Sequence, residues 1–417
     1  MSPLTTIKSL DSATRNNLAN LFLVAFLFWT SITCLLPTLP VYIITLGGTK
    51  QQVGMVMGSF AIGLLLSRTL LGRLADYGGR RLVMLIGTAV VASAPLGYLF
   101  FPSIMGLVLS RAYHGISIAA FTTGYSSLIV DLSPIKQKGE IIGYMTLAMP
   151  IGMSIGPALG GFIQSEWGNT PLFLVAIVTG LLAFLLTLRV KNSSTKHISI
   201  EKNQENINLV ALLTIRGMGV LTAILLLIGL VFGNLVAFVP LFINEELTGF
   251  NVGLFYTVIA IASFTVRIFT GRISDIYGRG LFISMSLCFY MLSMLCLTIA
   301  TTPNLLILAA IFEGSGAGLL IPMVIALMSD RCYPRERGRA FAICLGGFDL
   351  GIALAGPLLG TFADDLGYRG LFVISLILAS LALVNFLLFS NQKFGASFRF
   401  AFGKEKDFYA LDKIIPE

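Results

Sequence analysis

Long apolar runs separated by short polar stretches make up most of this chain. About twelve runs of roughly 20 residues recur, at approximately 18–44, 53–74, 82–101, 104–130, 140–163, 171–190, 217–243, 252–272, 280–301, 304–328, 339–363 and 369–390. A helix needs about 20 residues to cross the roughly 30 Å hydrocarbon core of a bilayer. Backbone groups in lipid must be paired within the protein, and runs this long exclude barrel strands. The pattern predicts an all-α, polytopic membrane protein with twelve transmembrane helices.

The composition agrees with this interpretation. Of the 417 residues, 56% are hydrophobic and 12% are charged, and the mean hydropathy is +0.89. A soluble domain carries about 25% charged residues. A chain with so few charged side chains cannot cover a surface that faces water, but it suits one that faces lipid.

A short polar loop between two apolar runs occurs twice. Residues 72–81 read G-R-L-A-D-Y-G-G-R-R, and residues 271–279 read G-R-I-S-D-I-Y-G-R, an offset of 199 positions. Such internal repetition indicates two copies of one unit. We expect two pseudo-symmetric six-helix bundles at 1–190 and 216–390, a polar linker at 191–215 and a tail at 391–417.

The charged residues predict the orientation. Lysines and arginines gather on one set of alternate loops, which includes the duplicated loop, the linker and the tail. The opposite loops hold only Lys50 and Arg369 among several acidic residues. By the positive-inside rule, both termini, the linker and the duplicated loop are cytoplasmic, and we place the protein in the cell (inner or plasma) membrane. This accounts for the net charge of +8 without a nucleic-acid partner.

The tail has two possible interpretations. Phenylalanines alternate with basic residues there, from Phe394 to Phe408. Such a segment either lies on the anionic inner leaflet or is loosely ordered.

The sequence lacks the motifs of several kinds of chemistry. There is no G-x-x-x-x-G-K-[ST] loop for an ATP-driven pump. Only two histidines occur, and none of the five cysteines forms a C-x-x-C pair, so we expect no metal site and no cofactor. We interpret the cysteines as small packing residues, and the protein is not expected to be an enzyme.

The duplicated loop suggests a cytoplasmic gate. Glycine at 72 allows helices to approach closely, and glycine at 78 and 79 allows a tight turn. The aspartate can accept from a helix start, and the arginines can reach carboxylates or helix ends. Asp131 and Asp330, again 199 apart, are natural partners for these arginines or for Arg68 and Arg267. The predicted gate is an ion-pair latch formed by Gly72, Asp76, Gly79, Arg80, Arg81, Asp131, Asp275, Arg279 and Asp330; the alternative is a topology signal with a surface turn.

The G-x-x-x-D-x-x-G-R-R element between the second and third runs, with its degenerate second copy, resembles the signature of the major facilitator superfamily. The resemblance covers nearly the whole chain. It implies two six-helix bundles around a central cavity that opens alternately to each side of the membrane.

The fifth run carries glycines at helical spacing. Gly143, Gly152, Gly156, Pro157, Gly160 and Gly161 read G-x8-G-x3-G-P-x2-G-G. From the residues alone, these positions predict a closely packed helix that proline can bend. The pattern also resembles the antiporter motif of proton-linked drug and metabolite exporters in the superfamily. The prolines at 37 and 40 are similar to the proline-rich end of the first span in those exporters.

Two ionisable residues lie inside the fourth run. Arg111 and His114 are three residues apart and share a helix face. Ionisable groups inside a membrane are functional candidates by default. The segment resembles the R-x-x-Q-G motif of the superfamily, with histidine where glutamine is usual, and the resemblance implies a role for the arginine in proton transfer. The histidine can be a proton carrier or a neutral, hydrogen-bonded residue, and the neighbouring cation favours the neutral form because it disfavours a second positive charge.

Two acids lie about halfway through later runs. Glu313 in the tenth run is the repeat counterpart of His114, and Asp349 lies in the eleventh. An acid in apolar surroundings can load and release protons near neutral pH. Glu313 and Asp349 are candidate proton-coupling groups, with Arg111 and His114 facing Glu313 across the cavity. The alternative is a static salt bridge between Arg111 and one acid.

These expectations describe a monomeric secondary transporter that exports a small organic molecule, a drug or a metabolite, in exchange for protons. Many multidrug exporters carry an acid in the first span, which is absent here, so a neutral, zwitterionic or anionic substrate suits the chain as well as a cationic drug. One alternative is proton-coupled uptake of a sugar or organic acid. A remote alternative is a non-transporting receptor or a membrane enzyme on the same scaffold.

Overall fold

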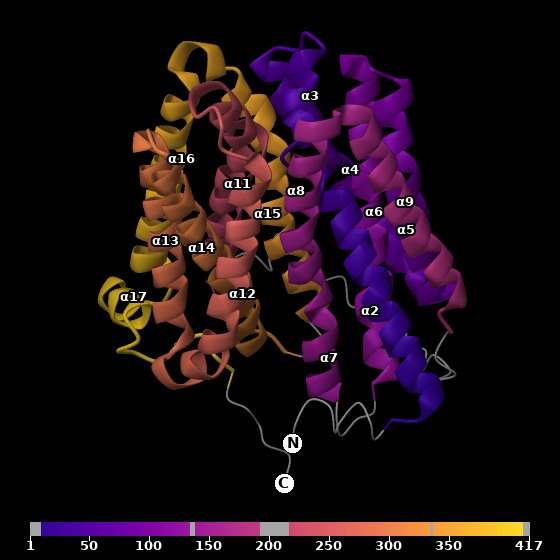
Figure 1. Cartoon of the computed structure of the whole chain (residues 1–417). Helices are drawn as coiled ribbons and strands as arrows, with labels where there is room; N and C mark the ends of the chain where they lie inside the picture. The colour runs from indigo at the N-terminus through magenta and orange to yellow at the C-terminus, as the bar shows by residue number, and fades with distance from the viewer. Residues whose placement is uncertain (1–9, 134–137, 192–216, 334–336, 412–417) are drawn as a thin grey trace. The chain divides into compact units, whose positions relative to one another are not determined.

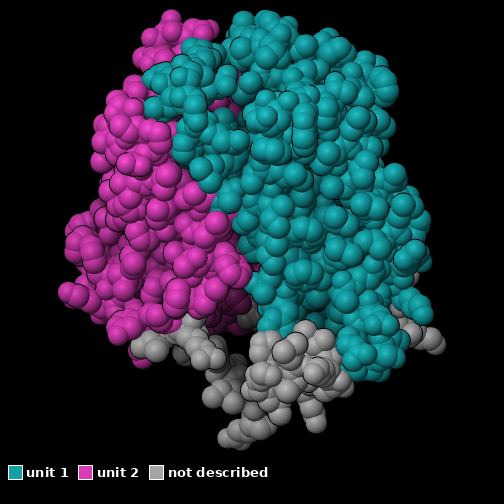
Figure 2. All heavy atoms as spheres, viewed as in Figure 1, with its two compact units in different colours: residues 1–199, 243–257 teal, residues 200–242, 258–417 magenta. Residues whose placement is uncertain are grey.

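The computed structural model describes residues 10–133, 138–191, 217–333 and 337–411 (Figure 1). The chain divides into two compact units, residues 1–199 with 243–257 and residues 200–242 with 258–417 (Figure 2). The predicted linker lies mostly within 192–216, outside the described residues. The described part of the first unit forms the helices α2 (Ser12–Thr33), α3 (Leu39–Thr45), α4 (Lys50–Gly78), α5 (Arg80–Phe100), α6 (Ile104–Leu132), α7 (Lys138–Thr146), α8 (Ala148–Trp167) and α9 (Asn169–Arg189).

The second unit repeats the plan and adds one short helix. Its described members are α11 (Met218–Glu246), α12 (Val252–Tyr277), α13 (Arg279–Ile299), α14 (Pro303–Arg331), α15 (Arg337–Gly360), α16 (Ala363–Phe389) and α17 (Phe394–Ala401). The end of α11 and the start of α12 are grouped with the first unit.

Twelve of the helical segments are long and apolar enough to cross a membrane, and each corresponds to one predicted run. The described residues contain no strand. The all-α, twelve-span prediction is therefore confirmed. Many large apolar side chains point outward from these helices; Leu66, for example, is 73% exposed. Such exposure is expected of helices whose outer faces contact lipid tails.

Two predicted runs are each divided into two helices, and proline explains both breaks. A proline ring clashes with the carbonyl group four residues earlier. Pro37 acts in this way on Thr33, where α2 ends, and Pro150 acts on Thr146, where α7 ends. The sequence pattern indicates that Pro157 can bend the fifth run. That residue lies inside α8 without interrupting it, so the break comes earlier in the span.

The turn after the second long helix of each unit depends on a glycine in the left-handed region. Gly79 separates α4 from α5 with φ 93°, and Gly278 separates α12 from α13 with φ 85°. Residues with a Cβ atom rarely adopt this conformation. The predicted tight turn is confirmed in both copies.

The repeat extends to the packing of the fourth span of each unit against the second. Gly115 of α6 lies against the backbone oxygen of Phe60 in α4, and Gly314 of α14 lies against that of Ile259 in α12. Gly314 and Ile259 each lie 199 positions after their counterparts Gly115 and Phe60. A side chain at either glycine would collide with the neighbouring backbone, so glycine here sets the closest approach of the two helices.

Candidate functional site

The duplicated loop places one ion pair in each unit. Arg80 at the start of α5 pairs with Asp131 near the end of α6. Arg279 at the start of α13 pairs with Asp330 near the end of α14, with 3.0 Å between Nη1 and Oδ2. All four side chains are between one fifth and one third exposed. The predicted partnership of these arginines and aspartates is confirmed, and each pair joins two helices of its own unit.

Other members of the predicted gate differ in what the structure shows. The Arg81 guanidinium group donates to the backbone oxygen of Leu188 on α9. The side chains of Asp76 and Asp275 lie outside the described residues. A Cβ atom at Gly72 would meet no described atom within 4 Å, so the close helix approach expected there is not found among the described residues.

The fourth span of the first unit buries a polar cluster that faces α4 and α5. His114 is fully buried, and its Nδ1 lies 2.9 Å from the Tyr98 hydroxyl of α5. The Phe60 ring of α4 meets the imidazole edge-on, with 5.8 Å between centroids. The second ring nitrogen, Nε2, has no hydrogen-bond partner among the described residues. His114 is thus held by a phenol and an aromatic ring.

Arg111 lies one turn away in the same cluster. Its side chain is 3% exposed, and its guanidinium carbon sits 4.4 Å from the centroid of the Phe60 ring. Within the described residues, its Nε and Nη1 atoms have no hydrogen-bond partner. A cation–π contact offsets only part of the cost of burying a cation. This arginine therefore holds unused hydrogen-bond donors in the middle of a span.

Glu313 occupies the equivalent place on α14. Its side chain is fully buried, and neither carboxyl oxygen has a hydrogen-bond partner among the described residues. Ser293 of α13 lies beside it, but the serine hydroxyl donates to the backbone oxygen of Ala309 at 2.9 Å. Ionisation of this carboxyl group would place a bare charge in the protein interior. The second candidate acid, Asp349, lies on α15 and is half-buried.

The sequence analysis did not identify the aromatic members of these clusters. Tyr98 contacts His114, and Tyr290 of α13 lies close to Glu313; both phenols are buried. A tyrosine within an otherwise apolar run could have indicated such a contact, because a buried phenol usually needs a hydrogen-bond partner.

The glycines of the fifth span form the contact with the first span. Gly156 and Gly160 of α8 lie against Thr33 and the backbone of Cys34, and Gly152 lies against Trp29. The close packing predicted from their spacing is confirmed. Gly143 is different, because it lies on α7 and a Cβ atom there would meet nothing within 4 Å.

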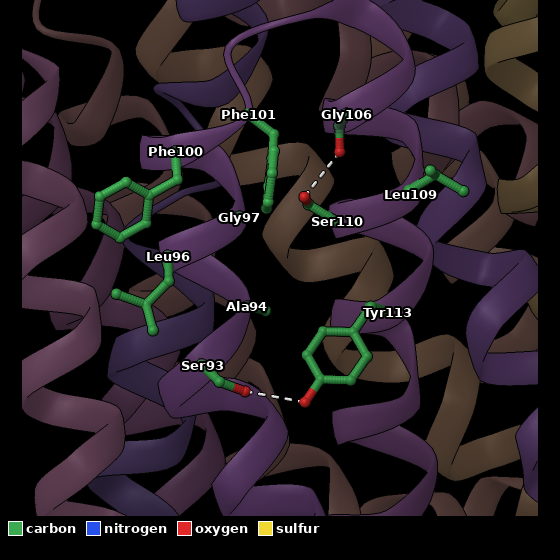
Figure 3. Close-up of a pocket in the computed structure, with 10 residues that line it drawn as sticks. All are labelled: Ser93, Ala94, Leu96, Gly97, Phe100, Phe101, Gly106, Leu109, Ser110 and Tyr113. Carbon is green, nitrogen blue, oxygen red and sulfur yellow. Dashed lines mark hydrogen bonds between the residues drawn. The ribbon is translucent and has the colours of Figure 1, made fainter.

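A pocket of about 560 Å³ opens between α5 and α6 (Figure 3). Its walls are mostly apolar, and Phe100 and Leu109 are both more than 60% exposed. Its hydroxyl groups are already bonded: Ser93 and Tyr113 lie 2.9 Å apart, and Ser110 donates to Gly106. No predicted site residue lines it. The pocket therefore offers a mostly apolar lining without a charged side chain.

Twelve helices that are apolar enough to span a membrane, in two related units with ionisable groups buried inside each, define a multi-pass membrane protein. The sequence pattern of the Major Facilitator Superfamily matches residues 21–264 and again residues 221–410. The chain belongs to this superfamily, as the loop motif indicated.

Relatives and solved structures agree with this assignment. The "Multi-drug resistance efflux pump PmrA homolog" of Lactococcus lactis is 29% identical over 378 residues, which cover 86% of this chain and 91% of that protein. The "Quinolone resistance protein NorA" of Staphylococcus aureus is 32% identical over 163 residues, 39% of this chain and 42% of that protein. The crystal structure of the nucleoside transporter NupG has a TM-score of 0.75 at 16% identity, covering 88% of this chain and 98% of that one, which shows the shared fold alone.

Proposed function

We propose that this protein exports a small organic molecule, a drug or metabolite, in exchange for protons. The observation that carries the proposal is Glu313, a fully buried carboxyl group whose oxygens have no partner among the described residues. Such a group holds its proton until water, a cation or a substrate reaches it. This is the behaviour that a proton-coupling site requires.

The direction of transport rests on the relatives. The protein that aligns with 86% of this chain is named a multidrug efflux pump, and the partial alignment is to a quinolone resistance protein. The glycine contact between α8 and α2 is the second support, because its sequence pattern resembles the antiporter motif.

In the proposed cycle, the two bundles alternate between outward-open and inward-open states. A proton from outside reaches Glu313 or Asp349 in the outward-open state. Substrate displaces that proton in the inward-open state and leaves on the next opening. Arg111 offers unused donors that can bind an anionic group or stabilise an ionised acid, and His114 is a neutral neighbour held by Tyr98.

The ion pairs Arg80–Asp131 and Arg279–Asp330 are proposed to steady the cytoplasmic helix ends that form the gate. The protein is proposed to act as a monomer in the cell membrane, with both termini in the cytoplasm. The support for this orientation is the excess of lysine and arginine on one set of loops.

Inside-out vesicles with an acidic interior test the exchange. We expect an added substrate to trigger proton exit, with a quinolone, sugars and organic acids as the test panel. Glu313→Gln keeps the shape and removes the titration, so proton exit should fall to the level of vesicles without the protein. Glu166→Gln replaces an exposed carboxyl group of α8 and should leave proton exit unchanged.

Two results would overturn the proposal. Protons entering together with the added compound would mean symport. Full coupled transport by the double variant Glu313→Gln, Asp349→Asn would show that neither acid couples protons to transport.

A further inference from the structure

The residues after the last span fold back onto the second unit. The helix α16 ends at Phe389, and α17 begins at Phe394 after a short connection (Figure 1). One face of α17 is buried: Ser397, Phe400 and Ala401 are each at most 4% exposed. The Ser284 hydroxyl of α13 donates to the backbone oxygen of Ala401 at 2.9 Å. The segment is therefore part of the folded unit as far as residue 411, and the loosely ordered alternative does not hold there.

A buried ion pair closes this segment. Arg331, at the end of α14, is fully buried and donates from Nε and Nη2 to the two oxygens of Asp407, at 2.8 and 2.9 Å. Its Nη2 also donates to the backbone oxygen of Ser390 at 2.7 Å. Such a bidentate pair fixes orientation as well as distance. We call residues 394–411 with this pair the C-terminal strap.

A single asparagine holds the two ends of the strap together. The Asn391 side-chain oxygen accepts from the backbone N–H of Phe408, and its Nδ2 donates to the backbone oxygen of Lys406, both at 3.2 Å. Its backbone N–H donates to the Ser397 hydroxyl at 2.9 Å. The strap thus returns to the connection that follows α16, and these bonds fix how the strap lies on the second unit.

The outward face of the strap is aromatic and basic. Phe394 and Phe398 of α17 and Phe402 directly after it are spaced four apart and are 64%, 47% and 47% exposed, and Phe408 is 59% exposed. The basic side chains near them in the sequence are all exposed: Lys393, Arg399, Lys404 and Lys406. The acids offset them little, because Asp407 is taken by Arg331, and Glu405 pairs with Arg399.

The connection fixes the depth of this face. Only residues 390–393 separate α17 from the end of a membrane span, and the strap also contacts the first half of α13 and the end of α14. Four residues reach about 14 Å at most. The first exposed phenylalanine of α17 therefore lies within that distance of the end of a membrane span, and aromatic rings and basic side chains are favoured at the boundary between lipid tails and headgroups.

We propose that the outward face of the C-terminal strap binds the surface of a bilayer that carries anionic lipids. The rings of Phe394, Phe398 and Phe402 enter the boundary of the acyl chains. Lys393, Lys404 and Lys406 bind the headgroup phosphates. The buried face and the pair between Arg331 and Asp407 transmit this contact to the end of α14, one residue from the ion pair of Asp330 with Arg279.

Tryptophan fluorescence in reconstituted membranes tests the proposal. Phe398→Trp adds a reporter on the outward face, and the unchanged chain supplies the background of Trp29 and Trp167. Vesicles contain phosphatidylcholine and phosphatidylglycerol, with bromine on the acyl chains of one or the other. We expect brominated phosphatidylglycerol to quench the new signal about twofold more than brominated phosphatidylcholine, because basic residues near the surface concentrate anionic lipid.

Two controls make the result specific. The Leu381→Trp variant places a reporter on α16, where the leucine side chain is 51% exposed, and both brominated lipids should quench it equally. Changing Lys393, Lys404 and Lys406 to glutamate should remove the preference at position 398.

Two outcomes would contradict the proposal. Equal quenching of the Phe398→Trp reporter in the unchanged charge background would overturn the anionic selectivity. The absence of quenching at position 398, in vesicles where the Leu381→Trp reporter is quenched, would overturn bilayer contact altogether. Neither outcome depends on transport.

Discussion

The charged residues of this protein form ion pairs that differ greatly in their exposure to water. The pair between Arg331 and Asp407 is almost completely buried, with 0% and 8% of the side chains exposed. Arg399 and Glu405 make a pair of the same length, 2.8 Å, with 62% and 37% exposed. The two ion pairs are equally long but differ in environment. Water screens the exposed pair between Arg399 and Glu405, whereas the buried pair between Arg331 and Asp407 is not screened.

This contrast predicts the stability of two matched variants. Asp407→Asn leaves a buried guanidinium group without its carboxylate, and the loss should be about 3–5 kcal/mol of unfolding free energy. Glu405→Gln removes a screened partner and should change it by less than about 1 kcal/mol. Thermal unfolding in one detergent compares both with the unchanged chain. Equal shifts would mean that the strap does not depend on Arg331.

The pair between Arg279 and Asp330 predicts a different kind of effect. Both side chains are partly exposed, so Asp330→Asn should cost less than about 1 kcal/mol of stability. If the pair steadies the gate, the transport rate should fall several-fold at nearly unchanged thermal stability. The exchange Arg279→Asp with Asp330→Arg should recover part of the rate. A normal rate in Asp330→Asn would show that the pair only fixes topology.

At the scale of the helix, the contact between α8 and α2 is made by backbone. Gly160→Ala would place a Cβ atom against the backbone oxygen of Cys34. Overpacking of this kind typically costs about 1–3 kcal/mol. Gly143→Ala on α7 meets nothing within 4 Å and should stabilise the chain by up to about 1 kcal/mol, since alanine favours a helix over glycine. Equal thermal stabilities of the two variants would contradict this packing.

Helices were easier to predict from the sequence than the directions of their side chains. Length and apolarity identify a span, so all twelve runs correspond to described helices. The sequence placed Arg111, His114 and Glu313 inside spans, but it did not identify their neighbours, which are Phe60, Tyr98 and Ser293. Helix rotation decides those contacts, and it follows from packing at glycines such as Gly115 and Gly314 rather than from hydropathy.

Helix breaks and the strap were missed for local reasons. The proline effect acts four residues before the proline, so Pro150 and not Pro157 divides the fifth span. The strap depends on Asp407 meeting Arg331, which is 76 positions earlier, and sequence spacing alone gives no sign of such a pair.

For the whole molecule, the distribution of lysine and arginine predicts which ends of the helices face the cytoplasm. In a cysteine-free chain, Lys404→Cys should react with a membrane-impermeant maleimide only in inside-out vesicles. Lys50→Cys, at the start of α4, should react only in right-side-out vesicles. Reaction of Lys404→Cys from the right-side-out surface would reverse the orientation and, with it, the proposed cytoplasmic gate.

The buried pair of the strap has a consequence for synthesis. Arg331 leaves the ribosome 76 residues before its carboxylate partner. At about 5–20 residues per second, it waits roughly 4–15 s. During that interval Arg331 lacks its carboxylate partner, so this buried pair can form only after residue 407 has been made. A premature stop after α16 would leave twelve inserted spans and a buried Arg331 without Asp407, its carboxylate partner.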